Sequence, residues 1–334
     1  MTSEVSSEDI DLVTNLINEK LRGQFPHVSS NDRCIFRVPK ELRRVNEKAY
    51  EPRIIAIGPY HHGKEHLIAM VEHKIRYLLR FLQRRNENDV SRYVQIIEGL
   101  EERARRCYAE PLHLTKDAFI EMMLLGGCFI VEFIWKLIEC EQDPVIGSEH
   151  VLGRLMLDLL LLENQLPFFI FSELLVNSNV RGTQNRPAES NFIKIISFYY
   201  ESFLPGPGYH PDLNNVYTPE EIIEIKNLLG LLRDHWKPSP ERMAAYQEEK
   251  GNVKRFTRCA TELREAEIKL KSVEGFNLFD INFERGIIKI PKIKIADKTE
   301  CVFRNAIAYE QLTSLKNPYF TDYMIFMDNL IDSA

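Results

Sequence analysis

The 334-residue sequence contains none of the short motifs that mark common catalytic or nucleotide-binding sites. It has no GxSxG elbow, and neither GxGxxG nor GxxxxGK[ST] occurs. The HExxH pattern, which would place a general base beside a zinc ion, is also missing. No cysteine has the flanking residues of a known nucleophile. The sequence therefore identifies no catalytic residue and no cofactor, and it favours a non-enzymatic role.

A strong charge of one sign is lacking as well. The net charge of -6 is small for this length, and 44% hydrophobic with 28% charged residues is ordinary globular usage. This balance gives no case for nucleic-acid binding. Residues 33–92 are the exception, because they hold 14 Lys and Arg against 7 Asp and Glu. That local excess indicates either a solvated helix face or a surface for an anionic partner.

Closely spaced cysteines are a third absence. The six cysteines lie far apart in the sequence and form no CxxC pair, so no zinc or disulfide pattern is indicated. The first residues do not have the pattern of a secretory signal peptide. We therefore expect reduced thiols and a cytoplasmic location.

Two hydrophobic runs are long enough to raise the question of a membrane span. Residues 118–138 carry Glu121, Glu132 and Lys136, and one charge at the bilayer centre costs about 2.5–3.5 kcal/mol. Residues 152–175 also carry charges, and a proline interrupts them. We predict that both runs are buried core helices and that this chain has no membrane span.

Hydrophobic periodicity separates helical from extended segments. Apolar residues at helical spacing predict helices over 8–22, 65–85, 91–107, 117–138, 148–166 and 168–175. In the helix over 65–85, the predicted apolar face includes Ile75 and Leu79. Short β-prone runs occur at 34–38 and 53–57, and residues 268–295 alternate apolar with polar side chains.

These patterns predict an α+β fold in a single domain over residues 1–334. The prediction comprises a predominantly α-helical core over about 60–235 and a terminal helix over 299–332. Strands near 34–57 and 268–295 would form a small, mainly antiparallel sheet, joining the two ends of the chain.

Residues 60–73 hold the best candidates for ligand chemistry: His61, His62, Gly63 and Lys64. Glycine and lysine at a helix N-terminus offer free N–H groups and positive charge to an anion. Histidines at this spacing can also bind zinc, although no established metal motif is present. Packing and capping at the start of a helix is the third interpretation. We predict no metal site. The alternative function is an enzyme, or a protein that binds a small ligand or an anion, using the Tyr60–His73 region.

A second polar group lies inside the apolar run over residues 155–171. A carboxylate in such a setting must be paired or hydrogen-bonded, because burying a lone charge is very costly. We therefore predict a structural polar network and name Arg154, four residues before Asp158, as a partner for it. The predicted members are Arg154, Asp158, Glu163, Asn164 and Gln165. A pocket acid is the alternative interpretation.

Several long segments resemble one plant-specific family. They include CIFRVPKELRRVNEKAYEPRIIAIGPYHHGKEHL (34–67), DAFIEMMLLGGCFIVEFI (117–134), LMLDLLLLENQLPFFI (155–170), FTRCATELREAEIKLK (256–271), RGIIKIPKIKI (285–295) and FRNAIAYEQ (303–311). In order and spacing, these segments resemble the family called domain of unknown function 247, of the UPF0481 type, over nearly the whole chain.

The resemblance implies a plant protein without an established activity, cofactor or catalytic residue. It also implies that some relatives act in self-incompatibility, and that longer relatives continue into a membrane-spanning tail at the plasma membrane or another membrane. We expect this chain to be a C-terminally shortened member. We also expect a non-enzymatic recognition or signalling component, whose protein partners contact exposed loops at 177–191 and 204–217.

Overall fold

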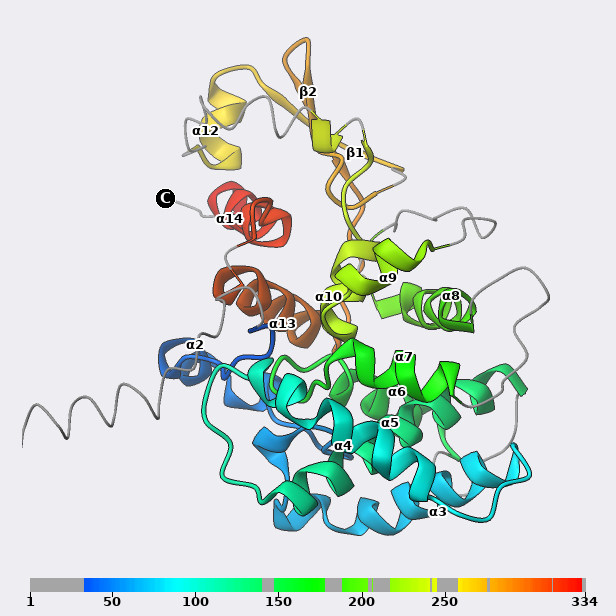
Figure 1. Cartoon of the computed structure of the whole chain (residues 1–334). Coiled ribbons are helices and arrows are strands. Elements are labelled where there is room, and N and C mark those ends of the chain that lie inside the picture. The colour runs from blue at the N-terminus through cyan, green and yellow to red at the C-terminus, as the bar shows by residue number, and fades with distance from the viewer. Residues whose placement is uncertain are drawn as a thin grey trace, which may run out of the picture.

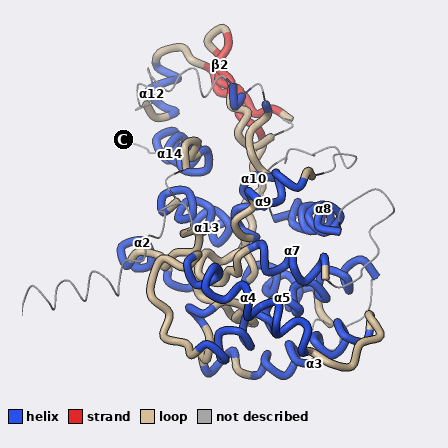
Figure 2. Tube along the Cα trace, in the orientation of Figure 1, coloured by secondary structure: helices blue, strands red, loops and turns tan. Residues whose placement is uncertain are grey.

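The computed structural model describes residues 33–139, 147–177, 188–203, 206, 217–240, 242–244, 258–274, 277–313 and 315–331 (Figure 1). Helices make up most of this part of the chain, and strands are confined to one small region (Figure 2). The predicted α+β fold, dominated by helices, is therefore confirmed. The predicted helix over 8–22 and most of the loops at 177–191 and 204–217 lie outside the described residues.

The helices are distributed along the whole described chain. The α-helices are α2 (Lys40–Val45), α3 (Ala69–Gln83), α4 (Ser91–Arg106), α5 (Lys116–Glu139), α6 (Glu149–Asp158), α7 (Phe168–Val176), α8 (Ala188–Tyr200), α9 (Pro219–Glu224), α10 (Leu228–His235), α12 (Ala260–Glu265), α13 (Thr299–Leu312) and α14 (Tyr319–Ile331). Short 3-10 turns are η1 (Glu47–Ala49), η2 (Pro59–His61), η3 (Glu65–Leu67) and η4 (Glu201–Phe203).

Helix α5 is the centre of the core. It is hydrophobic on all sides, and 16 of its 24 residues are buried. Helices α3, α4, α7 and α8 pack around it. Among the described residues α5 is long and apolar enough to cross a membrane, yet 83% of its most apolar stretch is buried in the fold. The core carboxylate Glu132 is fully buried and pairs with Arg84 at 2.8 Å. The predicted core helix over 117–138 is confirmed.

The sheet has three strands in the order β1-β3-β2. Strand β1 (Lys269–Val273) runs parallel to β3 (Ile287–Pro291), whereas β2 (Asn282–Glu284) runs antiparallel to β3. The sheet lies beside α12 and α14, away from the helices around α5 (Figure 1). It is mixed, so the prediction of a mainly antiparallel sheet is wrong in that detail.

Residues 34–57 do not join this sheet, which corrects the predicted pairing. Ile35 makes one isolated parallel bridge to Tyr108, and the run at 53–57 forms no strand. Side chains accept hydrogen bonds from the N–H groups of Val38, Ile54 and Ile57. The N–H groups of Cys34 and Ile35 bond to the Cys107 carbonyl. In a short apolar run, the sequence alone does not distinguish a β-strand from a buried segment without regular structure.

The two ends of the described chain do meet, but through a helix. Asn305 of α13 donates from Nδ2 to the carbonyl of Ala49 at 2.8 Å, and Asn46 donates to Glu300 at 2.9 Å. The predicted helix over 299–332 is divided into α13 and α14, with Pro318 directly before α14. Proline is compatible with a helix start and disfavours a continuous helix.

Gly126 allows helix α5 to approach the backbone of Ile57 closely. A Cβ at this position would lie 2.8 Å from the carbonyl oxygen of Ile57, a backbone atom that has little freedom to move. A Cβ added at Gly99, on the exposed side of α4, would have no atom within 4 Å. The two helical glycines therefore differ only in their surroundings.

We expect Gly126→Ala to lower the free energy of unfolding by about 1–3 kcal/mol, because the added methyl group overpacks the contact with residue 57. Gly99→Ala is the matched control and should raise it by about 0.5–1 kcal/mol through helix propensity alone. Urea unfolding of both variants measures the difference. Equal effects of the two substitutions would contradict this packing.

Candidate functional site

The structure separates the two adjacent histidines of the sequence-predicted site. His61 ends η2 and is 1% exposed, whereas the next residue, His62, is exposed. Gly63 follows with a φ of 77°, in the left-handed region that glycine adopts easily. Helix α3 begins only at residue 69, after the 3-10 turn η3, so Gly63 and Lys64 do not lie at its N-terminus.

His61 and Lys64 belong to a polar cluster, defined here as Arg43, Glu51, His61, Lys64 and Glu163. His61 and Glu163 are buried, and the other three are partly buried. The Arg43 guanidinium lies 2.7 Å from Glu163 Oε2 and also pairs with Glu51. Lys64 pairs with Glu51 as well. The other oxygen of Glu163, Oε1, accepts a 2.7 Å hydrogen bond from the backbone N–H of Val38.

His61 lies between the two carboxylates of this cluster. Its Nε2 is 3.3 Å from Glu163 Oε2, and its Nδ1 is 3.5 Å from Glu51 Oε2. Neither contact has the alignment of a good hydrogen bond. We therefore treat both as electrostatic contacts that position the ring.

Neighbouring side chains and one backbone N–H lower the pKa values of the two carboxylates in this cluster, Glu51 and Glu163. Burial alone would raise the pKa of Glu163, but His61, Arg43 and the Val38 N–H outweigh it and lower the pKa to about 2. Burial opposes ionisation of Glu51 too, and Lys64, His61 and Arg43 together lower its pKa. Both carboxylates are thus ionised at neutral pH.

Each charge in the cluster already has an internal partner. Lys64, the predicted anion-binding cation, is occupied by Glu51. In the part of the chain that the structure describes, no group of three or more His, Cys, Asp or Glu side chains is placed to hold a metal ion. A small polar cavity nearby, of about 70 Å³, is lined by Glu51 but not by His61 or Glu163. The internal pairing of this polar cluster fits a structural role better than a binding site.

A second set of polar side chains holds residues 53–58. Both oxygens of Asp158 accept backbone hydrogen bonds, at 2.6 Å from Ile54 and about 3.0 Å from its two neighbours. Asn164 accepts from the N–H of Ile57 at 2.8 Å and donates to the Ile55 carbonyl at 2.9 Å. Side chains thus replace a neighbouring strand, and each buried N–H that they reach is satisfied.

The remaining predicted members of the network lie on either side of this set. Gln165 donates to two carbonyls of the turn that it closes and accepts from the N–H of Leu229 at 3.1 Å. Arg154 lines the small polar cavity beside Asp158, but no ion pair joins the two among the described residues. Backbone N–H groups take the place of the expected arginine, because they lie closer to the carboxylate.

The local excess of positive charge is largely neutralised within the fold. Seven of the 14 basic residues in this region form ion pairs: Arg37, Arg43, Lys64, Arg76, Arg80, Arg84 and Arg92. Lys74 is buried, and its ammonium donates to the Ala56 carbonyl at 3.0 Å. Burial lowers the Lys74 pKa to about 8. Less positive charge is therefore available to an anionic partner than the sequence suggests.

Exposed apolar side chains form a line along α3, which we call the α3 ridge: Ile68, Ile75 and Leu79. They are 54%, 51% and 55% exposed. Spacings of seven and eleven residues bring side chains back to nearly the same angle on a helix of 3.6 residues per turn. The ridge lies opposite the buried residues Tyr77 and Phe81.

The sequence pattern placed Ile75 and Leu79 among the apolar residues of an amphipathic helix, and the structure leaves both side chains about half exposed. The sequence did contain a sign that some apolar residues of α3 are exposed, because its apolar positions cover a wider arc than one contact face requires. Arg43 and Glu51 were not recognised at all, since nothing in the sequence links them to Glu163.

Comparison with known proteins identifies the family. The family model described as DUF247, plant protein of unknown function, matches residues 35–334. This chain belongs to that family. The chain is similar to the UPF0481 protein At3g47200 of Arabidopsis thaliana. The two are 29% identical over an alignment of 324 residues, which covers 90% of this chain and 65% of the relative. The chain thus spans a little under two thirds of that relative's length.

A second family relative is the putative UPF0481 protein At3g02645 of Arabidopsis thaliana. It is 25% identical over 141 residues, which are 42% of this chain and 26% of the relative. No solved structure matches the chain. The predicted membership of this plant family is confirmed, and the family description assigns no biochemical activity.

We expect Glu163→Gln to lower the free energy of unfolding at pH 7 by about 2–4 kcal/mol, because Arg43 would lose its buried counter-charge. Glu163 has a folded pKa of about 2, below its ordinary 4.5. Its stabilising contribution is therefore present above pH 4.5 and is lost as the pH falls towards 2. The variant should show a correspondingly weaker loss in that window.

Glu110→Gln is the matched control, since Glu110 pairs with Arg37 in an exposed ion pair. Such a pair contributes no more than about 1 kcal/mol. Thermal unfolding of the wild type and both variants from pH 2 to 7 measures these effects. If Glu163→Gln melted like the wild type at pH 7, the cluster would not be a structural tie.

Proposed function

We propose that this chain is a non-enzymatic recognition component that binds a protein partner through the α3 ridge. The carrying observation is the ridge itself: three large apolar side chains, each more than half exposed, in a line on one helix. Aligned apolar groups of this kind on a surface mark interaction sites. The ridge extends over about 16 Å, the rise of eleven helical residues.

The chemistry of the ridge suggests the kind of partner. Ile68, Ile75 and Leu79 share one helix face with Glu72, which pairs with Arg76. Apolar contacts with charged neighbours are typical of the seam between two packed helices. An amphipathic helix of the partner fits such a surface. Recognition of the kind that the family resemblance implies, self-incompatibility included, is one setting for this contact.

The internal pairing of the polar residues His61, Lys64 and Glu163 supports a binding role over catalysis. His61, Lys64 and Glu163 hold segments of the chain together, and their charges are matched inside the fold. A cytoplasmic location belongs to the same proposal, and the burial of α5 within the helical core supports it. No observation on the described residues favours anion binding at residues 60–73.

We expect Ile75→Asp to abolish binding of a protein partner, because a carboxylate would be buried without a counter-charge in the contact. Ile223→Asp is the matched control, since Ile223 is 69% exposed on α9. Affinity capture from plant tissue, with the partner identified, purified and titrated against all three proteins, measures the effect. Both variants should melt like the wild type.

Three results would contradict the proposal. The first is a partner that binds wild type and Ile75→Asp equally. The second is the absence of any reproducible partner. The third is a wild-type dimer, detected by light scattering, that Ile75→Asp converts to a monomer. In that case the ridge would serve self-association.

A further inference from the structure

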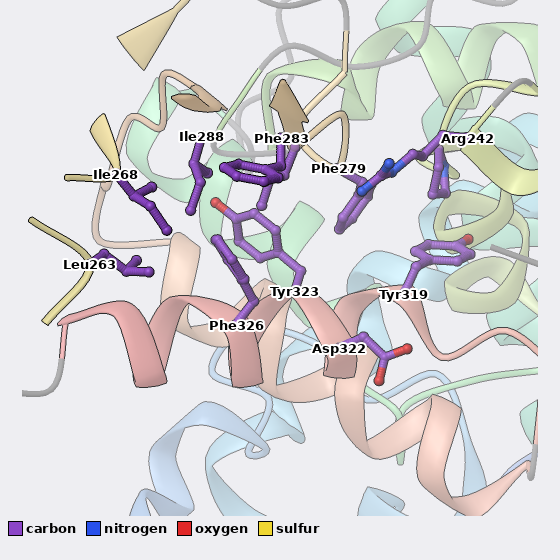
Figure 3. A pocket seen from close by; sticks show the side chains of 12 residues that line it. Arg242, Leu263, Ile268, Phe279, Phe283, Ile288, Tyr319, Asp322, Tyr323 and Phe326 are labelled. Atoms are coloured by element: carbon purple, nitrogen blue, oxygen red, sulfur yellow. The ribbon is translucent and has the colours of Figure 1, made fainter. Parts of the chain in front are cut away.

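A cavity of about 420 Å³ lies between α14, α12 and the three-stranded sheet, distant in sequence from the α3 ridge. Figure 3 shows Tyr323 and Phe326 extending from α14 into this space, with Phe283 and Ile288 of the sheet opposite them. Its volume falls in the range of pockets that hold small organic molecules.

The lining is apolar and rich in aromatic rings. Ten of its twelve residues are hydrophobic, aromatic or proline, and the two charged ones are Arg242 and Asp322. Among the described residues, the hydrophobic cluster beside the sheet has Leu263, Ile288 and Leu330 as its buried members. Protein interiors are normally filled to near-crystalline density. An apolar space of this size thus suits an occupant of matching chemistry.

One buried hydroxyl points into the space. Tyr323 is 4% exposed, and its Oη has no hydrogen-bond partner among the described residues. In Figure 3 this hydroxyl lies between the side chains of Ile288, Phe283 and Phe326. Burial raises the Tyr323 pKa to about 12, so the group keeps its proton and can donate it. A buried hydroxyl without an acceptor is unfavourable.

Arg242 supplies the second polar feature. Its side chain is exposed yet lines the cavity, which places it at the rim. Figure 3 shows it beside Phe279 and Tyr319, at the opposite end of the cavity from Leu263. A guanidinium at the rim favours a ligand whose outer end is anionic.

We propose that this cavity binds a small, mostly apolar molecule with a hydrogen-bond-accepting oxygen for Tyr323 and an anionic group for Arg242. An ω-hydroxylated medium-chain carboxylate has this chemistry. The apolar body would contact the aromatic lining, while its two polar ends meet the two polar residues of the cavity. This site is separate from the α3 ridge, so the two proposals stand or fall independently.

The test uses the full chain and displacement of the fluorescent probe 1-anilinonaphthalene-8-sulfonate by decanoate, 10-hydroxydecanoate and 1-decanol. We expect 10-hydroxydecanoate to bind about fivefold to tenfold more tightly than decanoate, as one hydrogen bond provides. Tyr323→Phe should remove that preference. Arg242→Met should weaken both carboxylates and leave 1-decanol unchanged.

Tyr93→Phe is the control, because Tyr93 on α4 is a buried tyrosine that does not line this cavity. This variant should bind every probe like the wild type. Without ligand, Tyr323→Phe should melt no lower than the wild type, since it removes only an unsatisfied hydroxyl.

Three results would overturn the proposal. The first is the absence of displacement by any of the three compounds. The second is equal displacement from wild type and Tyr323→Phe with the preference intact. The third is a lower melting temperature of unliganded Tyr323→Phe, which would show that another part of this chain already occupies the hydroxyl.

Discussion

Residues 53–58 form neither a helix nor a strand, and their backbone N–H groups are satisfied mainly by side chains. Asp158 alone accepts hydrogen bonds from three consecutive N–H groups, and Asn164 both donates and accepts. A buried N–H without a partner is costly, so the position of this segment depends on these carboxylate and amide groups. The position of η2 and the polar cluster follows from it.

The same arrangement explains why residues that resemble catalytic groups have a structural use. A charged residue inside a protein needs a partner. The partners of Glu163 are the backbone N–H of Val38 and the Arg43 guanidinium. His61 lies between two carboxylates, an arrangement that acid–base catalysts also use. Its burial and its neighbours make it part of the internal support.

Sequence reasoning predicted the helical core, because long amphipathic or all-apolar segments such as α3 and α5 have a strong periodic signal. It predicted a polar network around residues 154–165 from the cost of burying a carboxylate. It could not find the partners, since Asp158 meets residues 53–55 over a separation of more than 100 positions. The side of α3 that faces solvent, and the cavity beneath the sheet, also depend on tertiary packing.

The reach of these contacts also bears on the order of folding. Residues 34–58 are made early, yet their partners follow at Asp158, Asn164 and finally Asn305, 256 residues after Ala49. Until those side chains emerge, the N–H groups of residues 53–58 stay bonded to water, and these residues cannot take their final position. Long-range contacts of this kind slow folding and expose hydrophobic surface in the meantime. An early part of the chain is therefore fixed in place by residues that are made much later.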